Sequence, residues 1–178
     1  MIKTIVVPTD GSAHANKAVE LAADIAAKYG ARLVLVHALL RHTRAHEIAP
    51  LLEGTPLPAA LTEKLQEIQD ASLEAAMAAS SFEGGIVFLP VPENVLKEIG
   101  AIILDKARDT ARAKGVDAVV LHSVDGEPAE NILAAAEHEN ADMIVMGSRG
   151  LGSIASLFMG SVSHKVSHLS KCTCVTVK

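Results

Sequence analysis

Short runs of β-branched and other apolar residues alternate in this chain with longer segments whose apolar residues recur at helical spacing. The first run, residues 2–7, ends at Pro8. A helical segment, 13–29, follows, with Ser12 placed as its N-cap. A second apolar run covers 32–38. Strand, helix and strand within about 40 residues predict a βαβ unit, whose two strands lie parallel in one sheet.

The same alternation returns in the second half of the chain. The predicted elements there are helix 95–114, strand 117–124, helix 128–139, strand 142–146, helix 161–169 and strand 173–177. Gly115 ends the first of these helices, and Pro128 suits the first turn of the second. Five strands that alternate with helices predict an α/β fold, a five-stranded parallel sheet flanked by helices and Rossmann-like in type.

The alternation is interrupted between Leu39 and Glu93. Prolines and glycines punctuate the start of this stretch, a helix is predicted over 59–79, and a short apolar run covers 86–89. A stretch of about 55 residues is too small to hold a core of its own. We therefore predict one domain, residues 1–178, with an insertion at about 39–93.

Composition excludes several classes of function. A net charge of −5 and 2% aromatic residues argue against nucleic-acid binding, which needs basic and stacking side chains. No apolar run approaches the roughly 20 residues of a membrane-spanning helix, and the N-terminus lacks a secretory signal. The two cysteines, Cys172 and Cys174, are expected on opposite faces of the last strand and hence unbonded. These features predict a cytoplasmic protein that contacts neither nucleic acid nor membrane.

Ligands of parallel α/β sheets bind beyond the carboxyl ends of the strands. The loop 147–160 is the most informative segment there, because it contains Gly147, Gly150 and Gly160 and carries no carboxylate. Backbone N–H groups and two hydroxyls at the start of the following helix, residues 160–163, suit a phosphate group. A plain N-cap by Ser161, with the glycines serving a tight turn, fits the same residues, and the pattern leaves both interpretations open.

Other patterns in the sequence are weaker evidence for a function. Gly150-x-Gly152-x-x-Ala155 imitates a dinucleotide fingerprint but follows the wrong strand, and no Gly-Lys-Ser/Thr of a P-loop is present. Two histidine pairs at helical spacing, His42/His46 and His164/His168, have no third ligand nearby, so we expect surface histidines and no metal site. Asp10 is the one carboxylate expected at the site. It either contacts a ribose or a phosphate-bound Mg²⁺, or orders the turn before the first helix.

Several of these motifs together resemble the universal stress protein family. They are Val6 to Ser12, Val36 to Ala38, Gly126 to Pro128, and the spacing G-x2-G-x9-G-[ST] at Gly147, Gly150, Gly160 and Ser161. The resemblance covers nearly the whole chain outside 39–93. It implies a fold like that of the adenine nucleotide alpha hydrolases. Because the glycine spacing marks the ATP-binding members of the family, it also implies binding of ATP or AMP, with Mg²⁺.

The resemblance also implies which residues line the nucleotide site. They are Pro8, Thr9, Asp10, Ala38, Met146, Gly147, Arg149, Gly150, Gly160, Ser161, Val162 and Ser163. Residues 8–10 and Ala38 would lie at the adenosine end, and 160–163 would hold the phosphates. The family further implies a homodimer formed through the C-terminal strand. No residue is assigned a catalytic role.

The function expected from this resemblance is a nucleotide-responsive regulator in stress, which acts through an unidentified protein partner. Phosphate contacts would order the loop 147–160 and so change the surface offered to that partner. Two alternatives stay open. One is a slow ATPase or self-phosphorylating protein that uses Ser161, Ser163 or a serine of the loop, although no lysine clamp or general base is visible. The other is a nucleotide-free interaction module that binds a protein through 39–93.

Overall fold

The computed structural model describes residues 1–41, 48, 52, 57–79, 90–151 and 159–178. Two compact units make up the chain: Met1–Leu39 together with Gly100–Lys178, and Leu40–Ile99. Helix α4 begins in the second unit and ends in the first. The single domain with an insertion at about 39–93 stays a prediction.

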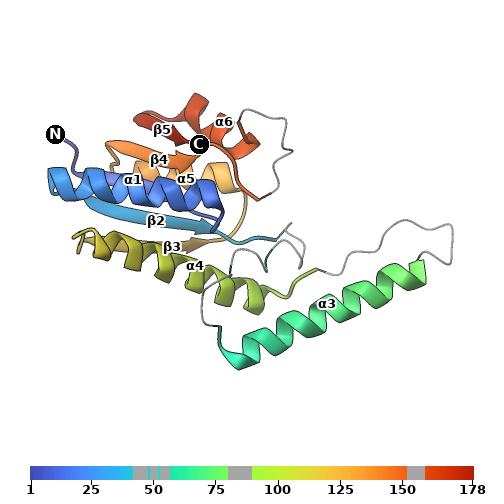
Figure 1. Cartoon of the computed structure of the whole chain (residues 1–178). Coiled ribbons are helices and arrows are strands. Elements are labelled where there is room, and N and C mark those ends of the chain that lie inside the picture. The colour runs from blue at the N-terminus through green and yellow to red at the C-terminus, as the bar shows by residue number, and fades with distance from the viewer. Residues whose placement is uncertain (42–47, 49–51, 53–56, 80–89, 152–158) are drawn as a thin grey trace. The chain divides into compact units, whose positions relative to one another are not determined.

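The first unit is built on a five-stranded sheet (Figure 1). Its strands are β1 (Thr4–Pro8), β2 (Arg32–Ala38), β3 (Val119–Val124), β4 (Met143–Gly147) and β5 (Thr173–Val177). They lie in the order β3-β2-β1-β4-β5, and every neighbouring pair is parallel. The predicted five-stranded parallel sheet is therefore confirmed.

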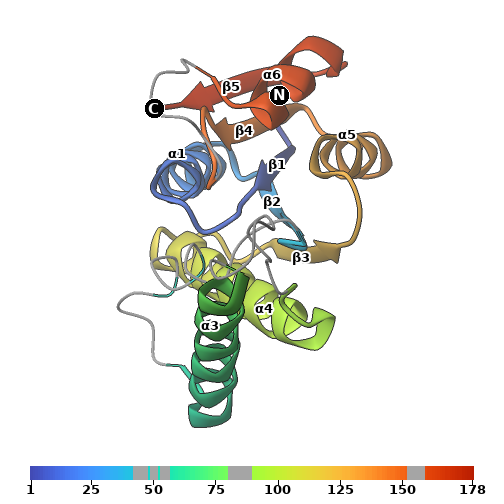
Figure 2. The same cartoon turned by 90° about the vertical axis from the view of Figure 1, so that its right-hand side faces the viewer.

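Helices cover both faces of this sheet (Figure 2). The helices of the first unit are α1 (Ala13–Tyr29), the later part of α4 (Glu93–Ala113), α5 (Pro128–His138) and α6 (Ser161–Leu169). Buried residues of α1 and α4 share one apolar cluster with Ile5 and Leu33, while α5 and α6 share another with Val6 and Val34. Successive residues of β1 and β2 thus point to opposite helical layers, as strand geometry requires.

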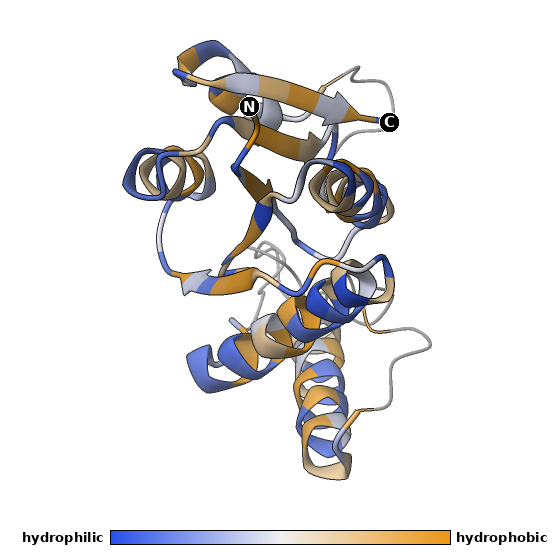
Figure 3. Ribbon diagram, turned by 90° about the vertical axis from the view of Figure 1, so that its left-hand side faces the viewer, coloured by the Kyte–Doolittle hydropathy of each residue, from blue (hydrophilic) through white to orange (hydrophobic). Residues whose placement is uncertain are grey.

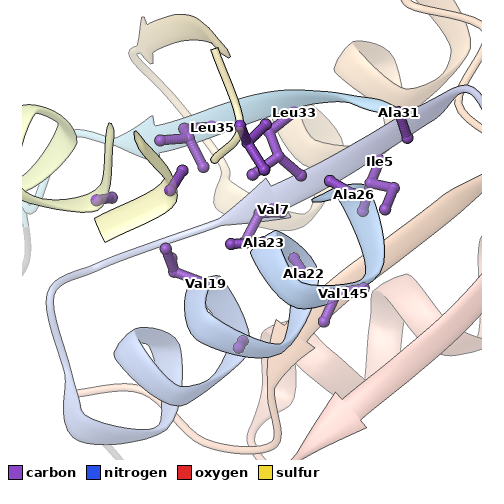
Figure 4. Packing of buried hydrophobic residues seen from close by; sticks show 14 of the residues in the cluster. Ile5, Val7, Val19, Ala22, Ala23, Ala26, Ala31, Leu33, Leu35 and Val145 are labelled. Carbon is purple, nitrogen blue, oxygen red and sulfur yellow. The ribbon is translucent and has the colours of Figure 1, made fainter. Parts of the chain in front are cut away.

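The core between α1 and the sheet is made of small helical residues against branched strand residues. Ala22, Ala23 and Ala26 pack toward Ile5 and Val7 (Figure 4). All are fully or almost fully buried. The sheet strands are mostly apolar, whereas the helices carry a polar and an apolar side (Figure 3). A sheet covered on both faces needs such near-continuous apolar strands.

Local signals in the sequence are largely confirmed. Ser12 caps α1 by accepting a hydrogen bond from the Ala15 N–H, and Gly30 ends that helix with a left-handed φ of 65°. Pro128 opens α5. The prediction that Cys172 and Cys174 face opposite ways is wrong, since both pack against the apolar cluster beneath α5 and α6. Residues two apart in an extended chain share a face.

The second unit contains α3 (Ala59–Ala79) and the beginning of α4. Leu61, Val95 and Ile99 are buried in it, and Glu93 pairs with both Arg41 and Lys97. The predicted run 86–89 and the pair His42/His46 lie outside the described residues. In the described part of the chain, no helix has the length and apolar character to cross a membrane.

Candidate functional site

The carboxyl ends of β1 and β4 lie side by side at the centre of the sheet. From β1 the chain enters α1 on one face, and from β4 it reaches α6 on the other. The strand order also changes direction here, because β2 and β3 follow β1 on one side and β5 follows β4 on the other. Such a switch point is where open parallel sheets bind their ligands.

Asp10 ties the turn after β1 to the loop after β4. Its Oδ1 accepts a hydrogen bond from the Ser12 N–H at 3.0 Å, and its Oδ2 accepts one from the Leu151 N–H at 3.1 Å. Gly11 between them has a φ of 81°, a conformation that glycine adopts without strain. The carboxylate therefore does order the turn, as one of the two expectations held. Because each oxygen keeps a second lone pair, Asp10 can also accept a bond from a ligand.

Two glycines of the loop lie in close contact with neighbouring atoms. A Cβ on Gly150 would collide with Asp10 Oδ2. A Cβ on Gly147 would lie 2.9 Å from the Ala15 nitrogen and from the His14 carbonyl carbon, which are backbone atoms of α1. The loop after β4 thus runs directly against the start of α1, and residues with a side chain would separate the two.

The backbone of Ser148 joins both ends of the loop. Its carbonyl accepts hydrogen bonds from the Gly160 N–H at 2.8 Å and from the Ser163 hydroxyl at 2.8 Å. Its N–H donates to the Val177 carbonyl of β5 at 2.7 Å. Ser163 is buried, and it shares its one hydroxyl hydrogen between the Ser148 carbonyl and the Gly160 carbonyl, the latter at 2.9 Å. These bonds fix the start of α6 beside the end of β4.

The first turn of α6 has no side-chain cap. Gly160 occupies the N-cap position, and Ser161 is the first helical residue, with an exposed side chain. The interpretation of Ser161 as an N-cap is therefore wrong, because the helix begins one residue earlier in register than a serine cap needs. No described residue accepts a hydrogen bond from the N–H groups of Ser161, Val162 or Ser163. Because N–H groups at a helix N-terminus carry a partial positive charge, this turn favours a negatively charged ligand.

Charge distinguishes α6 from the neighbouring helix start. Residues 143–178 contain four basic side chains and no carboxylate. Helix α5, by contrast, begins with Glu127 at its N-cap, Pro128 without an N–H, and Glu130 in its first turn. Of these two helix starts, only that of α6 combines available N–H groups with the absence of negative charge. It suits an anion.

His37 lies near the end of β2, in the segment Val36 to Ala38 that the sequence analysis singled out without giving this side chain a role. It is fully buried, and its Nδ1 lies 2.9 Å from the Thr9 carbonyl, to which it donates. Burial lowers the pKa of His37, although the Thr9 hydrogen bond and the Asp10 charge raise it in part. A Cβ on Gly100 would lie 2.7 Å from the ring, so that glycine makes room for it. His37 thereby holds the backbone next to Asp10.

The structure brings most, not all, of the expected site residues together. The contacts described above join Asp10 to the loop at Gly150, and they join Ser148 to Gly160 and Ser163. Pro8 and Ala38 end their strands, and Met146 is buried in β4. Arg149 is half-buried in the loop. Ala38 pairs with Val124 of β3.

The contacts of three residues near the site were not predicted. Ser148 lies within the loop 147–160 and His37 within the segment Val36 to Ala38, but neither was given a role, and His14 was not singled out. Their contacts depend on partners far away in the chain. His164 and His168 are exposed on α6. Among the described residues, no group of three or more His, Cys, Asp or Glu side chains is placed to hold a metal ion.

Comparison with known sequences gives a consistent result. The sequence model of the universal stress protein family matches residues 1–178. A universal stress protein of Thermus aquaticus, encoded in the 3′ region of a QAH/OAS sulfhydrylase gene, is 36% identical over 179 residues, and the alignment covers 100% of both chains.

Solved structures show the same fold. A universal stress protein in complex with cAMP is 25% identical, with a TM-score of 0.60, and the match covers 99% of this chain and 97% of that one. The universal stress protein of Archaeoglobus fulgidus in complex with dAMP is 18% identical, with a TM-score of 0.58 and coverage of 100% and 98%. The second likeness concerns the fold alone.

Proposed function

The chain belongs to the universal stress protein family, and on that premise we propose that it binds an adenine nucleotide, ATP or AMP, at the switch point between β1 and β4. The observation that carries the proposal is the start of α6, where three N–H groups face no described acceptor and no carboxylate lies nearby in sequence. The cAMP complex of the structural relative supports an adenine nucleotide as the anion.

The phosphates would bind at α6 and at the loop before it. Backbone N–H groups of Ser161, Val162 and Ser163 donate to phosphate oxygens, and the Ser161 hydroxyl adds a further donor. A hydrogen bond to a charged group contributes about 1.5–3 kcal/mol. Gly160 has no side chain, and a Cβ there would lie 3.6 Å from Arg149 Cα, the Ser148 carbonyl oxygen and Ser163 Oγ. The glycine therefore keeps space beside the first turn of α6 for a phosphate. Gly147, Arg149 and Gly150 complete the phosphate and ribose contacts.

The adenosine end would lie over the ends of β1 and β2. Pro8, Thr9 and Ala38 offer backbone edges and short side chains there, with Met146 below. A chain with 2% aromatic residues grips adenine through aliphatic contacts and backbone hydrogen bonds. Asp10 uses its remaining lone pairs for a ribose hydroxyl or for Mg²⁺ bound to the phosphates.

The cellular role we propose is regulation under stress, in the cytoplasm and as a homodimer. Strand β5 is hydrogen-bonded to β4 alone among the described strands, so its outer edge is available for pairing across a two-fold axis. Nucleotide would act by favouring one arrangement of the loop 147–160, and the dimer would then offer a different surface to its protein partner.

The test is a calorimetric titration of the nucleotide-free chain with ATP, AMP and cAMP, each with and without Mg²⁺. Gly160→Val places a branched side chain at the start of α6, where a Cβ meets its nearest atoms at 3.6 Å, an ordinary van der Waals distance. Circular dichroism and thermal melting check that the variant is folded. We expect its affinity to fall about tenfold or more, which corresponds to about 1.4 kcal/mol.

The matched control is Ser167→Val, which adds the same side chain at an exposed position of α6 away from its first turn. It should bind like the wild type. Equal affinity of Gly160→Val and wild type would refute the site, and a wild type that binds none of the three nucleotides would refute the function.

A further inference from the structure

The two cysteines of the chain lie together at the amino end of β5. Cys174 is the second residue of that strand, and Cys172 precedes the strand by one residue. Both are reduced and half-buried. Both pack against the apolar cluster beneath α5 and α6, so their thiols share one face of the strand.

A serine hydroxyl lies beside the first of the two thiols. Ser170 Oγ lies 3.4 Å from Cys172 Sγ, and it accepts the Cys172 N–H at 3.2 Å and donates to the Cys172 carbonyl at 3.0 Å. Cys174 follows two residues later and packs against the same apolar cluster, so both thiols lie on one face at the start of β5.

We propose that Cys172 and Cys174 form a two-thiolate binding site for one soft monovalent cation, of which Cu(I) is the biologically available member. On binding, each thiol releases its proton to solvent and its sulfur donates an electron pair to the metal. The resulting complex carries a single negative charge. It lies in the segment 143–178, which contains no carboxylate. Copper stays in the same oxidation state throughout.

The geometry favours a bridging cation over a disulfide. In an extended chain, residue i and residue i+2 are separated by about 6.6 Å between their Cα atoms. This distance is at the upper end of what a disulfide spans. A metal ion bound between the two sulfur atoms allows them to stay further apart than a direct S–S bond does.

The ligand count favours a soft ion over zinc. Structural zinc sites use four protein ligands. The described part of the chain gathers no third His, Cys, Asp or Glu with this pair. Cu(I) selects thiolates strongly and accepts two ligands, so the pair is sufficient for it.

This site is separate from the nucleotide site. Thr173, at the start of β5, pairs with Met143 at the start of β4, whereas the far end of β5 reaches Ser148 through the Val177 carbonyl. The thiols and the start of α6 therefore lie at opposite ends of β5. Loss of one site need not affect the other, and the two can be tested independently.

The experiment is an anaerobic competition for Cu(I) between the reduced full-length chain and bathocuproine disulfonate, followed by the colour of the copper–chelator complex. We expect the wild type to withdraw one copper per chain. Cys172→Ser and Cys174→Ser should each reduce the withdrawn copper to the background of the double variant. Because these are the only two cysteines, that background measures all histidine and methionine binding.

Two further variants sharpen the result. Thr173→Ala changes the exposed residue between the cysteines and should bind copper normally. Ser170→Ala removes the hydroxyl beside Cys172 and should weaken binding about tenfold, as loss of an outer-shell partner does. Circular dichroism and thermal melting check that each variant is folded. Retention of copper by either single cysteine variant, loss of it in Thr173→Ala, or loading of half a copper per chain with doubled mass on gel filtration would overturn the proposal.

Discussion

Replacing Gly150 with alanine should destabilise the protein through Asp10. The new Cβ would collide with Asp10 Oδ2, and the carboxylate can move away only by giving up its bond to the Leu151 N–H, 3.1 Å long. A hydrogen bond to a charged group contributes about 1.5–3 kcal/mol. Since Asp10 is half-exposed, we expect a loss near the lower limit, about 1.5 kcal/mol.

The assay is thermal unfolding of four proteins: wild type, Gly150→Ala, Asp10→Ala and the double variant. In a chain of this length a loss of about 1.5 kcal/mol lowers Tm by about 3–6 °C. In the Asp10→Ala background the obstructing carboxylate is gone, and Gly150 has no positive φ to protect. There the same replacement should be neutral or raise stability by about 0.5 kcal/mol. An equal fall of Tm in both backgrounds would refute the reasoning.

Two further predictions follow from the same region. Gly147→Ala should lower the free energy of unfolding by about 1–3 kcal/mol, the usual range for overpacking, because backbone atoms of α1 lie 2.9 Å from the new Cβ. Gly160→Ala, the control, should change Tm little. A larger fall of Tm for Gly160→Ala than for Gly147→Ala would contradict the contacts at Gly147. The pKa of His37 lies below 6.5 in the folded protein because of burial, so the unfolded chain binds more protons near pH 6. The contribution of neutral His37 to the free energy of unfolding is therefore fully present above about pH 6.5. It declines as the pH falls, by up to about 1.4 kcal/mol per pH unit. His37→Gln cannot take up that proton, and its unfolding free energy, measured with urea between pH 7 and 5, should decline less steeply than that of the wild type; parallel curves would exclude His37 as the titrating group.

The layers of this fold could be predicted from sequence because their signals are local. Apolar runs and helical spacing located the strands and helices of the first unit to within a few residues, and Ser12, Gly30 and Pro128 marked helix ends as expected. Strand β3 begins at Val119, two residues later than the predicted run. Apolar runs continue into connecting segments, so they place strand ends less sharply than caps place helix ends.

The contacts of the site could not be predicted in the same way. Asp10 and Leu151 are 141 residues apart, and nothing near either one in sequence indicates the other. The buried role of His37 depends on Gly100, and that of Ser148 on β5 and α6 together. The wrong N-cap at Ser161 has a local cause, since a glycine N-cap followed by serine resembles a serine N-cap shifted by one residue.

The uncapped first turn of α6 makes this helix a reporter in its own right. Helix α6 has nine residues, and amides that lack an acceptor exchange their hydrogens with solvent far faster than those within a helix. A bound anion would supply the missing acceptors, so the backbone hydrogens of Ser161 to Ser163 should exchange slowly when the site is filled. Mass spectrometry of one peptic fragment could then read the occupancy of the site in a crude extract, without knowledge of the ligand.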